Sequence, residues 1–311
     1  MKKQNSTYIN PLTDFGFKKL FGEEVNKEFL IDFLNSLLME EQGLIIDLKY
    51  QSTEQIGISQ GDRSAIYDLY CTNEKGDHFI VELQRANQTF FLDRTIYYSS
   101  FLIQKQGKRK TNWNYKLKSI YTIAILDFKM SQTVEKADKY YYKVKLTDIE
   151  TNEIIYPKLT FIYVELPKFT KEATQLLTHF DKWLYLFQNL GTLNEIPINL
   201  KENIFMKLLE KAKLENLPEI ERKNYQASLK RYRDTYSVIE TAKLEGLTEG
   251  HAKGYDEGLD QGLDQGISIG IDKEKNQVIK NAHEEGLSIA LIAKLTGLTE
   301  DEIITILKRL F

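Results

Sequence analysis

Two carboxylates and a glutamine stand in an otherwise apolar stretch, "YDLYCTNEKGDHFIVELQ" (residues 67–84). Asp68 belongs to one run of strand-forming residues, and Glu82 and Gln84 end the next run. If a three- or five-residue loop joins the two strands, positions whose numbers add to about 150 face each other, so we expect Asp68 opposite Glu82. Side chains alternate along a strand, which places Gln84 on the same face as Glu82. The spacing therefore predicts three polar groups on one patch of sheet.

Such a patch has a definite chemistry. Two neighbouring carboxylates repel each other unless a cation lies between them or one of them holds a proton. Oxygen ligands of this kind suit Mg²⁺ or Mn²⁺, and such an ion polarises a phosphodiester and lowers the pKa of bound water. We therefore expect Asp68 and Glu82 to be metal ligands. The alternative is a cross-strand pair at a solvated edge of the sheet, neutralised by Arg85 or Lys75.

The surrounding segments predict the elements that hold this hairpin. Apolar residues recur at helical spacing before and after it, and runs of β-branched and aromatic residues follow. A nearly all-apolar run predicts a central strand that is covered on both faces. The order favours a mixed α/β sheet flanked by helices. In chain order we expect two short helices in 11–42 broken near Phe21-Gly22, the hairpin, a helix over 88–106, and strands over 119–128, 140–150 and 159–166.

The pattern of residues changes in the second half of the chain. Amphipathic helical segments follow Pro167, and then glycine occurs at every fourth position from Gly246 to Gly270. We therefore divide the chain into four parts: an α/β core (1–170), a helical extension (171–240), a glycine-spaced segment (241–282) and a small terminal unit (283–311).

The glycine-spaced segment has two interpretations. Glycine costs up to about 1 kcal/mol at each interior helical position, so seven of them would weaken a lone helix severely. If the segment is helical, the bare stripe lets two helices approach closely, which favours a homodimer. Otherwise the segment is a frayed, flexible spacer.

The terminal unit has the spacing of a helix-turn-helix. Small and apolar residues surround a turn expected at Thr296-Gly297-Leu298. The second helix opens with Glu300-Asp301-Glu302, which would repel phosphates where a recognition helix meets them. We therefore expect this unit to pack against protein rather than to read bases.

A local basic patch is the best candidate for DNA binding. The stretch "KQGKRKTNWNYKLK" (105–118) contains no acid, and aromatic side chains lie between its cations. Cations neutralise phosphates and aromatic rings stack on bases. Because the stretch directly follows the helix over 88–106, we expect it to flank the cleft that contains Asp68 and Glu82. The alternative is a solvated basic loop. The residues expected to contact DNA are Arg94, Lys105, Lys108, Arg109, Lys110, Trp113 and Lys116.

The composition narrows the class of protein. The chain has 311 residues, 42% of them hydrophobic, and a net charge of −3 that gives no global attraction to nucleic acid. A single cysteine, Cys71, excludes an internal disulfide and a cysteine-based zinc cluster. The absence of a secretory signal and of 18 consecutive apolar residues predicts a cytoplasmic protein without a membrane span.

Several motifs together resemble a known family. The chain is similar to the PD-(D/E)XK nuclease core and, more closely, to the recombination-promoting nucleases (Rpn), also described as PD-(D/E)XK nuclease family transposases. The likeness covers residues 10 to about 300, including the glycine-spaced tail. Its motifs, in family order, are "NPLTDFGFKKLFG" (10–22), "YDLYC" (67–71), "IVELQ" (80–84), "FFLDRTIYYSS" (90–100), "YTIAILDF" (121–128) and "YVELPKF" (163–169).

The resemblance implies a Mg²⁺-dependent DNA endonuclease linked to recombination, mobile elements or phage defence, with metal ligation by Asp68 and Glu82. Gln84 takes the place of the lysine in the parent motif, and Tyr67 takes the place of its proline. A lysine supplies positive charge to the transition state, whereas glutamine only orients water or phosphate. Asp14, ahead of Glu23 and Glu24, is the candidate for a further acid; it is equally well placed as a helix N-cap.

Two other functional classes are alternatives to a DNA endonuclease. A non-catalytic protein with a nuclease-like fold would bind DNA or a partner and would be inactive because the lysine is lost. A strand-joining transposase is disfavoured, because the spacing of the acids is not the D…D…E layout that such enzymes use.

Overall fold

The computed structural model of the chain describes residues 6–55, 64–107, 114–130 and 139–310. The chain divides into two compact units, Met1–Ser237 and Val238–Phe311. Its strands are β1 (Leu48–Tyr50), β2 (Glu54–Gln55), β3 (Ala65–Ile66), β4 (Leu69–Asn73), β5 (His78–Gln84), β6 (Ile120–Leu126), β7 (Tyr141–Thr147) and β8 (Ile154–Glu165). Its α-helices are α1 (Asp14–Phe21), α2 (Lys27–Gln42), α3 (Phe91–Gln106), α4 (His179–Asn189), α5 (Asn203–Ala212), α6 (Glu219–Glu284), α7 (Ile289–Thr296) and α8 (Glu300–Leu310).

The first unit is built on a mixed sheet of six strands in the order β1-β4-β5-β6-β8-β7. β5, β6 and β8 are mutually parallel, whereas β4 and β7 run antiparallel to their neighbours. All seven residues of β6 are buried, which confirms the predicted central strand. Because the three parallel strands end at the same edge of the sheet, the residues that close β5, β6 and β8 meet there. We call this the carboxyl edge of the sheet.

The hairpin has the predicted register. Leu69 pairs with Val81 and Thr72 with His78, so the paired positions add to 150, and residues 73–77 form the loop. The strand is shorter than expected, since β4 begins at Leu69 and Asp68 precedes it. The six-stranded sheet does not extend before Leu69, because the preceding strand, β3, pairs with β2 in a separate two-stranded sheet. The Asp68 side chain, instead of a backbone carbonyl, accepts the hydrogen bond of the Leu83 N–H.

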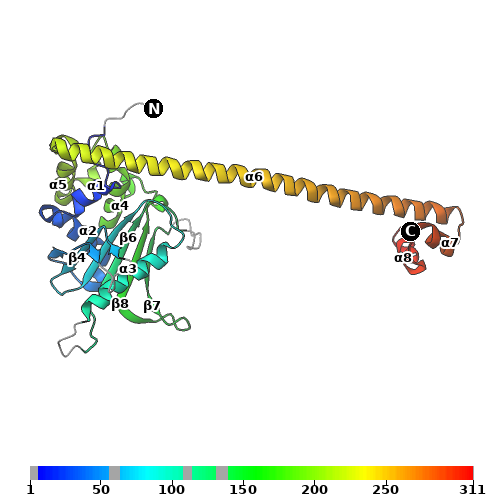
Figure 1. Cartoon of the computed structure of the whole chain (residues 1–311), viewed down its shortest axis with the longest axis horizontal. Helices are drawn as coiled ribbons and strands as arrows, with labels where there is room; N and C mark the ends of the chain where they lie inside the picture. Colours follow the sequence, from blue (N-terminus) through cyan, green and yellow to red (C-terminus); the bar gives the residue numbers. More distant parts are fainter. Residues whose placement is uncertain (1–5, 56–63, 108–113, 131–138, 311) are drawn as a thin grey trace. The chain divides into compact units, whose positions relative to one another are not determined.

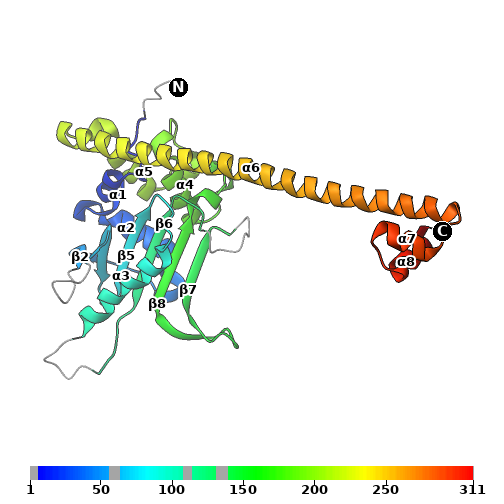
Figure 2. The ribbon, with the colours of Figure 1, turned by 45° about the vertical axis from the view of Figure 1, so that its right-hand side comes forward.

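Helices cover both faces of the sheet (Figures 1 and 2). α3 lies on one face, and its buried Phe91 and Leu102 pack there with strand residues. α1, α2, α4 and α5 cover the other face and share one hydrophobic cluster with it. The break predicted between the first two helices is confirmed, because α1 ends at Phe21 and Gly22 follows as its C-cap.

Helices α4 and α5 have no core separate from that of the sheet. Trp183 and Phe187 of α4 and Phe205 of α5 are buried in the same cluster as Phe21 and Phe33 of the first two helices. The rings of Phe21 and Phe187 stack with their centroids 5.3 Å apart. The predicted extension over residues 171–240 therefore completes the core of the first unit as far as Ser237.

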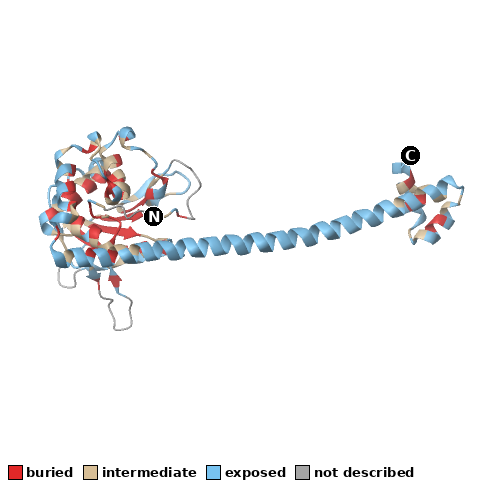
Figure 3. Ribbon diagram, turned by 90° about the horizontal axis from the view of Figure 1, so that it is seen from above, coloured by how far each residue is buried: buried red, intermediate tan, exposed pale blue. Residues whose placement is uncertain are grey.

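The second unit contains the glycine-spaced segment. Residues 241–282 are continuously helical within α6, so the interpretation as a frayed spacer is wrong for this structure. Every residue from 233 to 275 is exposed, as the pale blue stretch of α6 shows (Figure 3). A Cβ atom added at any of the seven glycines would meet no protein atom of the described residues within 4 Å.

The unit ends in a small helical cluster. Ile279 of α6 packs with Ile292, Ala293, Ile303 and Leu307. The turn between α7 and α8 lies where it was predicted, with Gly297 in the left-handed conformation at φ 72°. The Glu302 side chain accepts hydrogen bonds from the backbone and hydroxyl of Thr299, and the Glu302 N–H donates to that hydroxyl, so Thr299 and Glu302 form a capping box at the start of α8. No helix among the described residues is long and apolar enough to span a membrane.

Candidate functional site

The candidate site lies at the carboxyl edge of the sheet, where β5 ends. Glu82 and Gln84 are both buried, and β4 and β5 are interior strands of the sheet. The alternative of a solvated edge pair is therefore wrong. Lys75 does not neutralise the site, since its Nζ donates to the backbone carbonyl of Gln42 at the end of α2. The charge of Arg85, the other cation of that alternative, does act to lower the pKa of Asp68. The structure brings Asp68, Glu82 and Gln84 together, as the register predicted.

Both carboxylate oxygens of Glu82 accept hydrogen bonds. The backbone N–H of Asp68 donates to Oε1 at 3.2 Å, and Nε2 of Gln84 donates to Oε2 at 3.1 Å. The guanidinium of Arg94, in the first turns of α3, lies 3.4 Å from the same Oε2. Helix α3 therefore supplies the positive charge nearest to Glu82, and Gln84 holds the carboxylate from the neighbouring position on the same face.

Asp68 is held by the strand opposite. Its Oδ2 accepts a hydrogen bond from the Leu83 N–H at 2.7 Å, whereas its Oδ1 accepts no bond from any described residue. The two acids are thus linked reciprocally across the strands. The Glu82 side chain accepts the backbone N–H of Asp68, and the Asp68 side chain accepts the N–H of Leu83, the residue after Glu82. One carboxylate oxygen of Asp68 is left for a ligand.

The electrostatics show that the pair is short of positive charge. Burial, and then the negative charge of Asp68, raise the pKa of Glu82 to about 8, and Arg94 opposes this only in part. Burial also raises the pKa of Asp68, against the Leu83 N–H and the charge of Lys18. A proton therefore occupies the pair at neutral pH in place of a second cation.

Asp14 approaches the same site from α1. It is the first residue of the helix, and Thr13 is the N-cap, because the Thr13 side chain accepts the Gly16 N–H. The interpretation of Asp14 as a cap is therefore wrong. Asp14 instead forms an ion pair with Lys18 at 2.8 Å, one turn along the helix.

A pocket of about 280 Å³ opens between α1 and the end of β5. Asp14 and Asp68 both line it, whereas Glu82, which is bonded to the lining residue Gln84, does not. The full lining is Asp14, Phe17, Asp68, Leu83, Gln84, Arg85, Ala86 and Gln88.

The donor set fits a hard divalent cation in its chemistry. No group of three or more histidine, cysteine, aspartate or glutamate side chains is placed to hold a metal among the described residues. Mg²⁺ needs no such group, since one or two carboxylates, waters and substrate phosphates commonly complete its shell. The free oxygen of Asp68 and the carboxylate of Glu82, once it has released its proton, meet this requirement. A cation bound there would replace the proton and compete with Arg94 for Glu82.

Lys105, the first residue of the basic stretch, does not lie beside the acids. Lys105, in the last turn of α3, donates to Gln55 and lies over the Tyr70 ring, with Nζ 5.1 Å from its centroid. Eleven residues separate it from Arg94, which is about 17 Å along a helix. The expectation that Lys105 flanks the acids is therefore wrong, because α3 runs back along the sheet. Lys116 is exposed, and Lys108, Arg109, Lys110 and Trp113 lie outside the described residues.

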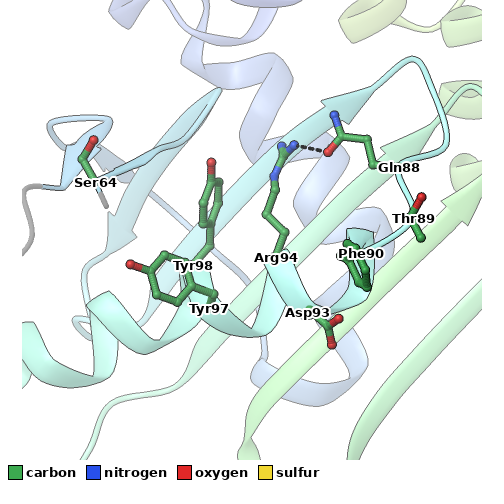
Figure 4. A pocket seen from close by; sticks show the side chains of 8 residues that line it. All are labelled: Ser64, Gln88, Thr89, Phe90, Asp93, Arg94, Tyr97 and Tyr98. Carbon is green, nitrogen blue, oxygen red and sulfur yellow. Dashed lines mark hydrogen bonds between the residues drawn. The ribbon is translucent and has the colours of Figure 1, made fainter. Parts of the chain in front are cut away.

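Three residues that the sequence did not single out also shape this region. Gln88, in the connection between β5 and α3, accepts a hydrogen bond from Arg94 at 2.8 Å (Figure 4). Asp127 follows β6, and its backbone N–H donates to the Gln84 carbonyl. The Tyr232 hydroxyl of α6 donates to Oδ2 of Asp127 at 2.9 Å. Asp127 directly follows the apolar strand of residues 120–126, a position that can mark the carboxyl edge, whereas nothing local marks Gln88 or Tyr232.

The sequence of the chain matches a known protein family. The family model described as "PD-(D/E)XK nuclease family transposase" matches residues 11–242. Comparisons with curated proteins and with solved structures each gave no match. The family match includes the whole hairpin, α3 and the start of α6, and it agrees with the six-stranded mixed sheet and its flanking helices. The chain therefore belongs to the PD-(D/E)XK nuclease family transposases.

Proposed function

We propose that this nuclease-type protein is a Mg²⁺- or Mn²⁺-dependent DNA endonuclease that hydrolyses phosphodiester bonds at the carboxyl edge of the sheet. One observation carries the proposal: Glu82 is buried next to Asp68, and its pKa is raised to about 8. Burying an ionised carboxylate costs roughly several kcal/mol, so a buried acidic pair is retained where a cation completes it.

Each residue of the site has a separate task in this proposal. Asp68 and Glu82 hold the cation, which when bound supplies positive charge to a phosphate oxygen and lowers the pKa of water. Gln84 orients the attacking water or the phosphate through its amide. Arg94, once it is displaced from Glu82, pairs with a phosphate oxygen. Asp14, on the facing helix of the pocket, is the candidate for a further acid.

The DNA is proposed to run along α3. Arg94 at its beginning and Lys105 at its end are about 17 Å apart. Cations spaced along one helix contact successive phosphates of a duplex, and the affinity then falls with increasing salt. The remaining proposed contacts are Lys108, Arg109, Lys110, Trp113 and Lys116.

We further propose that the exposed glycine stripe of α6 pairs two copies of the chain. Leu247, Tyr255, Leu259, Leu263 and Ile267 each follow a glycine of the stripe and are all exposed. A homodimer would present two sites and so suits the cutting of both strands. Recombination, element mobility and phage defence are the biological settings in which such cutting is proposed.

A second candidate function is a DNA- or protein-binding protein without strong nuclease activity. Two observations favour it: Gln84 stands where the parent motif has lysine, and Arg94 already forms an ion pair with Glu82. The two functions differ in their dependence on metal. An enzyme needs the cation for turnover, whereas a binder retains DNA equally with and without it.

A plasmid-nicking assay tests the proposal. We expect supercoiled DNA to be nicked when Mg²⁺ or Mn²⁺ is present and not when EDTA is added. Asp68→Ala and Glu82→Gln should each abolish nicking, whereas Glu74→Ala, an exposed acid in the loop of the same hairpin, should leave it unchanged. Nicking that persists in the Asp68 and Glu82 variants, or that never depends on metal, would contradict the assignment.

A further inference from the structure

A larger pocket opens beside the acids, where α3 begins. Its volume is about 630 Å³. Small-ligand sites commonly measure about 300–1,000 Å³, so the pocket is large enough for a nucleobase. Aromatic rings line it together with a few polar groups. The lining residues are Ser64, Gln88, Thr89, Phe90, Asp93, Arg94, Tyr97 and Tyr98 (Figure 4).

The aromatic residues of this pocket differ in how far their side chains are exposed. Tyr98 packs edge-on against Tyr67 with ring centroids 5.6 Å apart, and the Tyr67 hydroxyl donates to its backbone carbonyl. Phe90 is 72% exposed. Tyr97 is 42% exposed, although its ring packs edge-on against Phe101 with centroids 5.1 Å apart. Two aromatic rings that are partly exposed to water beside a third, more enclosed ring indicate a surface that a flat partner covers.

Arg94 joins this pocket to the acidic pair. Its guanidinium lies 3.4 Å from Glu82, donates to Gln88 and stands over the Tyr98 ring at 5.1 Å from the centroid. Figure 4 shows it between Tyr98 and Phe90. Gln88 lines this pocket and the pocket of Asp68 as well. A group bound in the aromatic pocket and a phosphate bound at the acids would therefore share Arg94 as a neighbour.

The charge of the lining distinguishes a base from a phosphate. Asp93 lines the pocket, and a carboxylate repels phosphate but accepts hydrogen bonds from the N–H groups of a base edge. Gln88 and Thr89 offer further donors and acceptors for such an edge. Stacking on tyrosine and phenylalanine requires that the base be unpaired or turned out of the duplex.

We propose that this pocket receives an unpaired base of the DNA strand that is cut, next to the phosphate held at Asp68 and Glu82. The inference rests on the proposed nuclease function and specifies its substrate class: DNA with an unstacked nucleotide, such as a bulge, a mismatch or a single-stranded segment. Phe90 and Tyr97 then act as stacking groups that determine specificity, and Arg94 bridges the base and the phosphate.

The test is a comparison of two DNA duplexes that are identical except for one unpaired nucleotide. The dissociation constant of the full chain for each duplex is measured by fluorescence anisotropy in EDTA, so that no cutting occurs. We expect the bulged duplex to bind at least about tenfold more tightly, the size of one base–aromatic stack. Phe90→Ala and Tyr97→Ala should bring the ratio close to one. Ile96→Ala is the matched control, because Ile96 is a 56% exposed residue of the same helix that does not line the pocket.

A second measurement does not depend on the variants. The bulged nucleotide is replaced by 2-aminopurine, whose fluorescence changes when the base leaves its DNA neighbours and stacks on an aromatic side chain. A ratio near one for the unaltered chain with no change in this fluorescence would overturn the inference, and so would an equal loss in the Ile96 control. Nicking without any preference for the bulge would refute the pocket but not the nuclease. Binding of the bulge without nicking would refute the nuclease but not the pocket.

Discussion

The guanidinium of Arg94 in α3 lies 3.4 Å from the carboxylate of Glu82 in β5, and the side chain of Glu82 is only 5% exposed. The residue expected to contact phosphate thus pairs, in this structure, with the acid expected to hold a metal ion. The two roles are compatible only if Arg94 changes partner when a cation or DNA arrives. This relationship makes the metal and Arg94 competitors for one carboxylate.

Replacing Arg94 should therefore have opposite effects on two ligands. In Arg94→Gln we expect Mn²⁺ to bind about tenfold more tightly, because Glu82 no longer has a charge-assisted hydrogen bond of roughly 1.5 kcal/mol to give up. DNA binding in EDTA should weaken at the same time. Isothermal titration calorimetry measures the first effect and fluorescence anisotropy the second. Lys105→Gln removes one charge from the far end of the same helix and should leave Mn²⁺ affinity unchanged; a matching change there would point to a general charge effect.

The stability of the metal-free protein should depend on pH through Glu82. The pKa of Glu82 is about 8 in the folded chain, against an ordinary value of 4.5. Between these two values the folded state holds a proton that the unfolded state has released, so the free energy of unfolding falls as the pH rises from 5 to 8. One such proton accounts for at most about 1.4 kcal/mol per pH unit.

Glu82→Gln removes this titration, because the amide cannot ionise. Urea unfolding in EDTA at pH 5, 6, 7 and 8 should show the wild type losing stability relative to the variant as the pH rises. Parallel curves for the two proteins would show that Glu82 does not hold the proton. Since a cation displaces that proton, Mn²⁺ affinity of the wild type should increase over the same pH range.

Gln84 offers a direct test of the altered motif. Gln84→Lys restores the positive charge of the parent motif beside Glu82, and we expect the single-turnover nicking rate in Mg²⁺ to rise, by roughly tenfold or more. Gln84→Met keeps a similar volume without the amide and should lower the rate below that of the wild type. Equal rates for the wild type and the methionine variant would mean that Gln84 takes no part in the reaction.

The bond between Tyr232 and Asp127 fixes the start of α6 to the carboxyl edge. Burial raises the pKa of Asp127, and Tyr232 opposes this by donating to its carboxylate. Tyr232→Phe should lower the free energy of unfolding by about 1–2 kcal/mol, since a half-buried acceptor loses its partner. Tyr255→Phe, an exposed residue of the same helix, should change it by less than about 0.5 kcal/mol. Equal losses in urea unfolding would contradict a specific bond at Tyr232.

The glycine stripe allows helix stability and self-association to be separated. Replacing Gly250, Gly258 and Gly266 by glutamine should raise helicity in far-UV circular dichroism, because glycine is disfavoured in helices by about 1 kcal/mol per residue. Nothing within the described residues obstructs these side chains. If two copies pair through the stripe, the same variant should sediment as a monomer.

The matched control places glutamine two residues after each of these glycines, at Ala252, Asp260 and Ser268, which is about 160° around the helix from that glycine, and should sediment like the wild type. A wild type that is already monomeric, or a dimer that both variants retain, would rule out the stripe as the contact.

Much of the fold follows from local patterns. The all-apolar run of residues 120–126 is enough to indicate a fully covered central strand, and Gly22 is enough to separate two helices. The register of Asp68 against Glu82 follows from loop length and from alternation along strands, both of which act over a few residues. For the same reason the left-handed turn at Gly297 is visible in the sequence.

The two predictions that the structure corrects, for Asp68 and for Lys105, also have physical causes. Asp68 looked like a strand residue, but its side chain takes the Leu83 N–H and the strand starts one residue later. Lys105 looked close to the acids because it is close to Arg94 along the chain. The helix between them runs back along the sheet and carries it to the other end, beside Tyr70.

By itself, the sequence determined which elements form and which acids face each other, because helical spacing, strand alternation and turn length are local properties of the chain. The tertiary structure decided what surrounds those acids: Arg94 from α3 pairs with Glu82, and Asp14 from α1 lines the pocket of Asp68. Burial and the partners of a charge depend on packing between distant segments, and these set whether Glu82 holds a proton, an arginine or a metal ion.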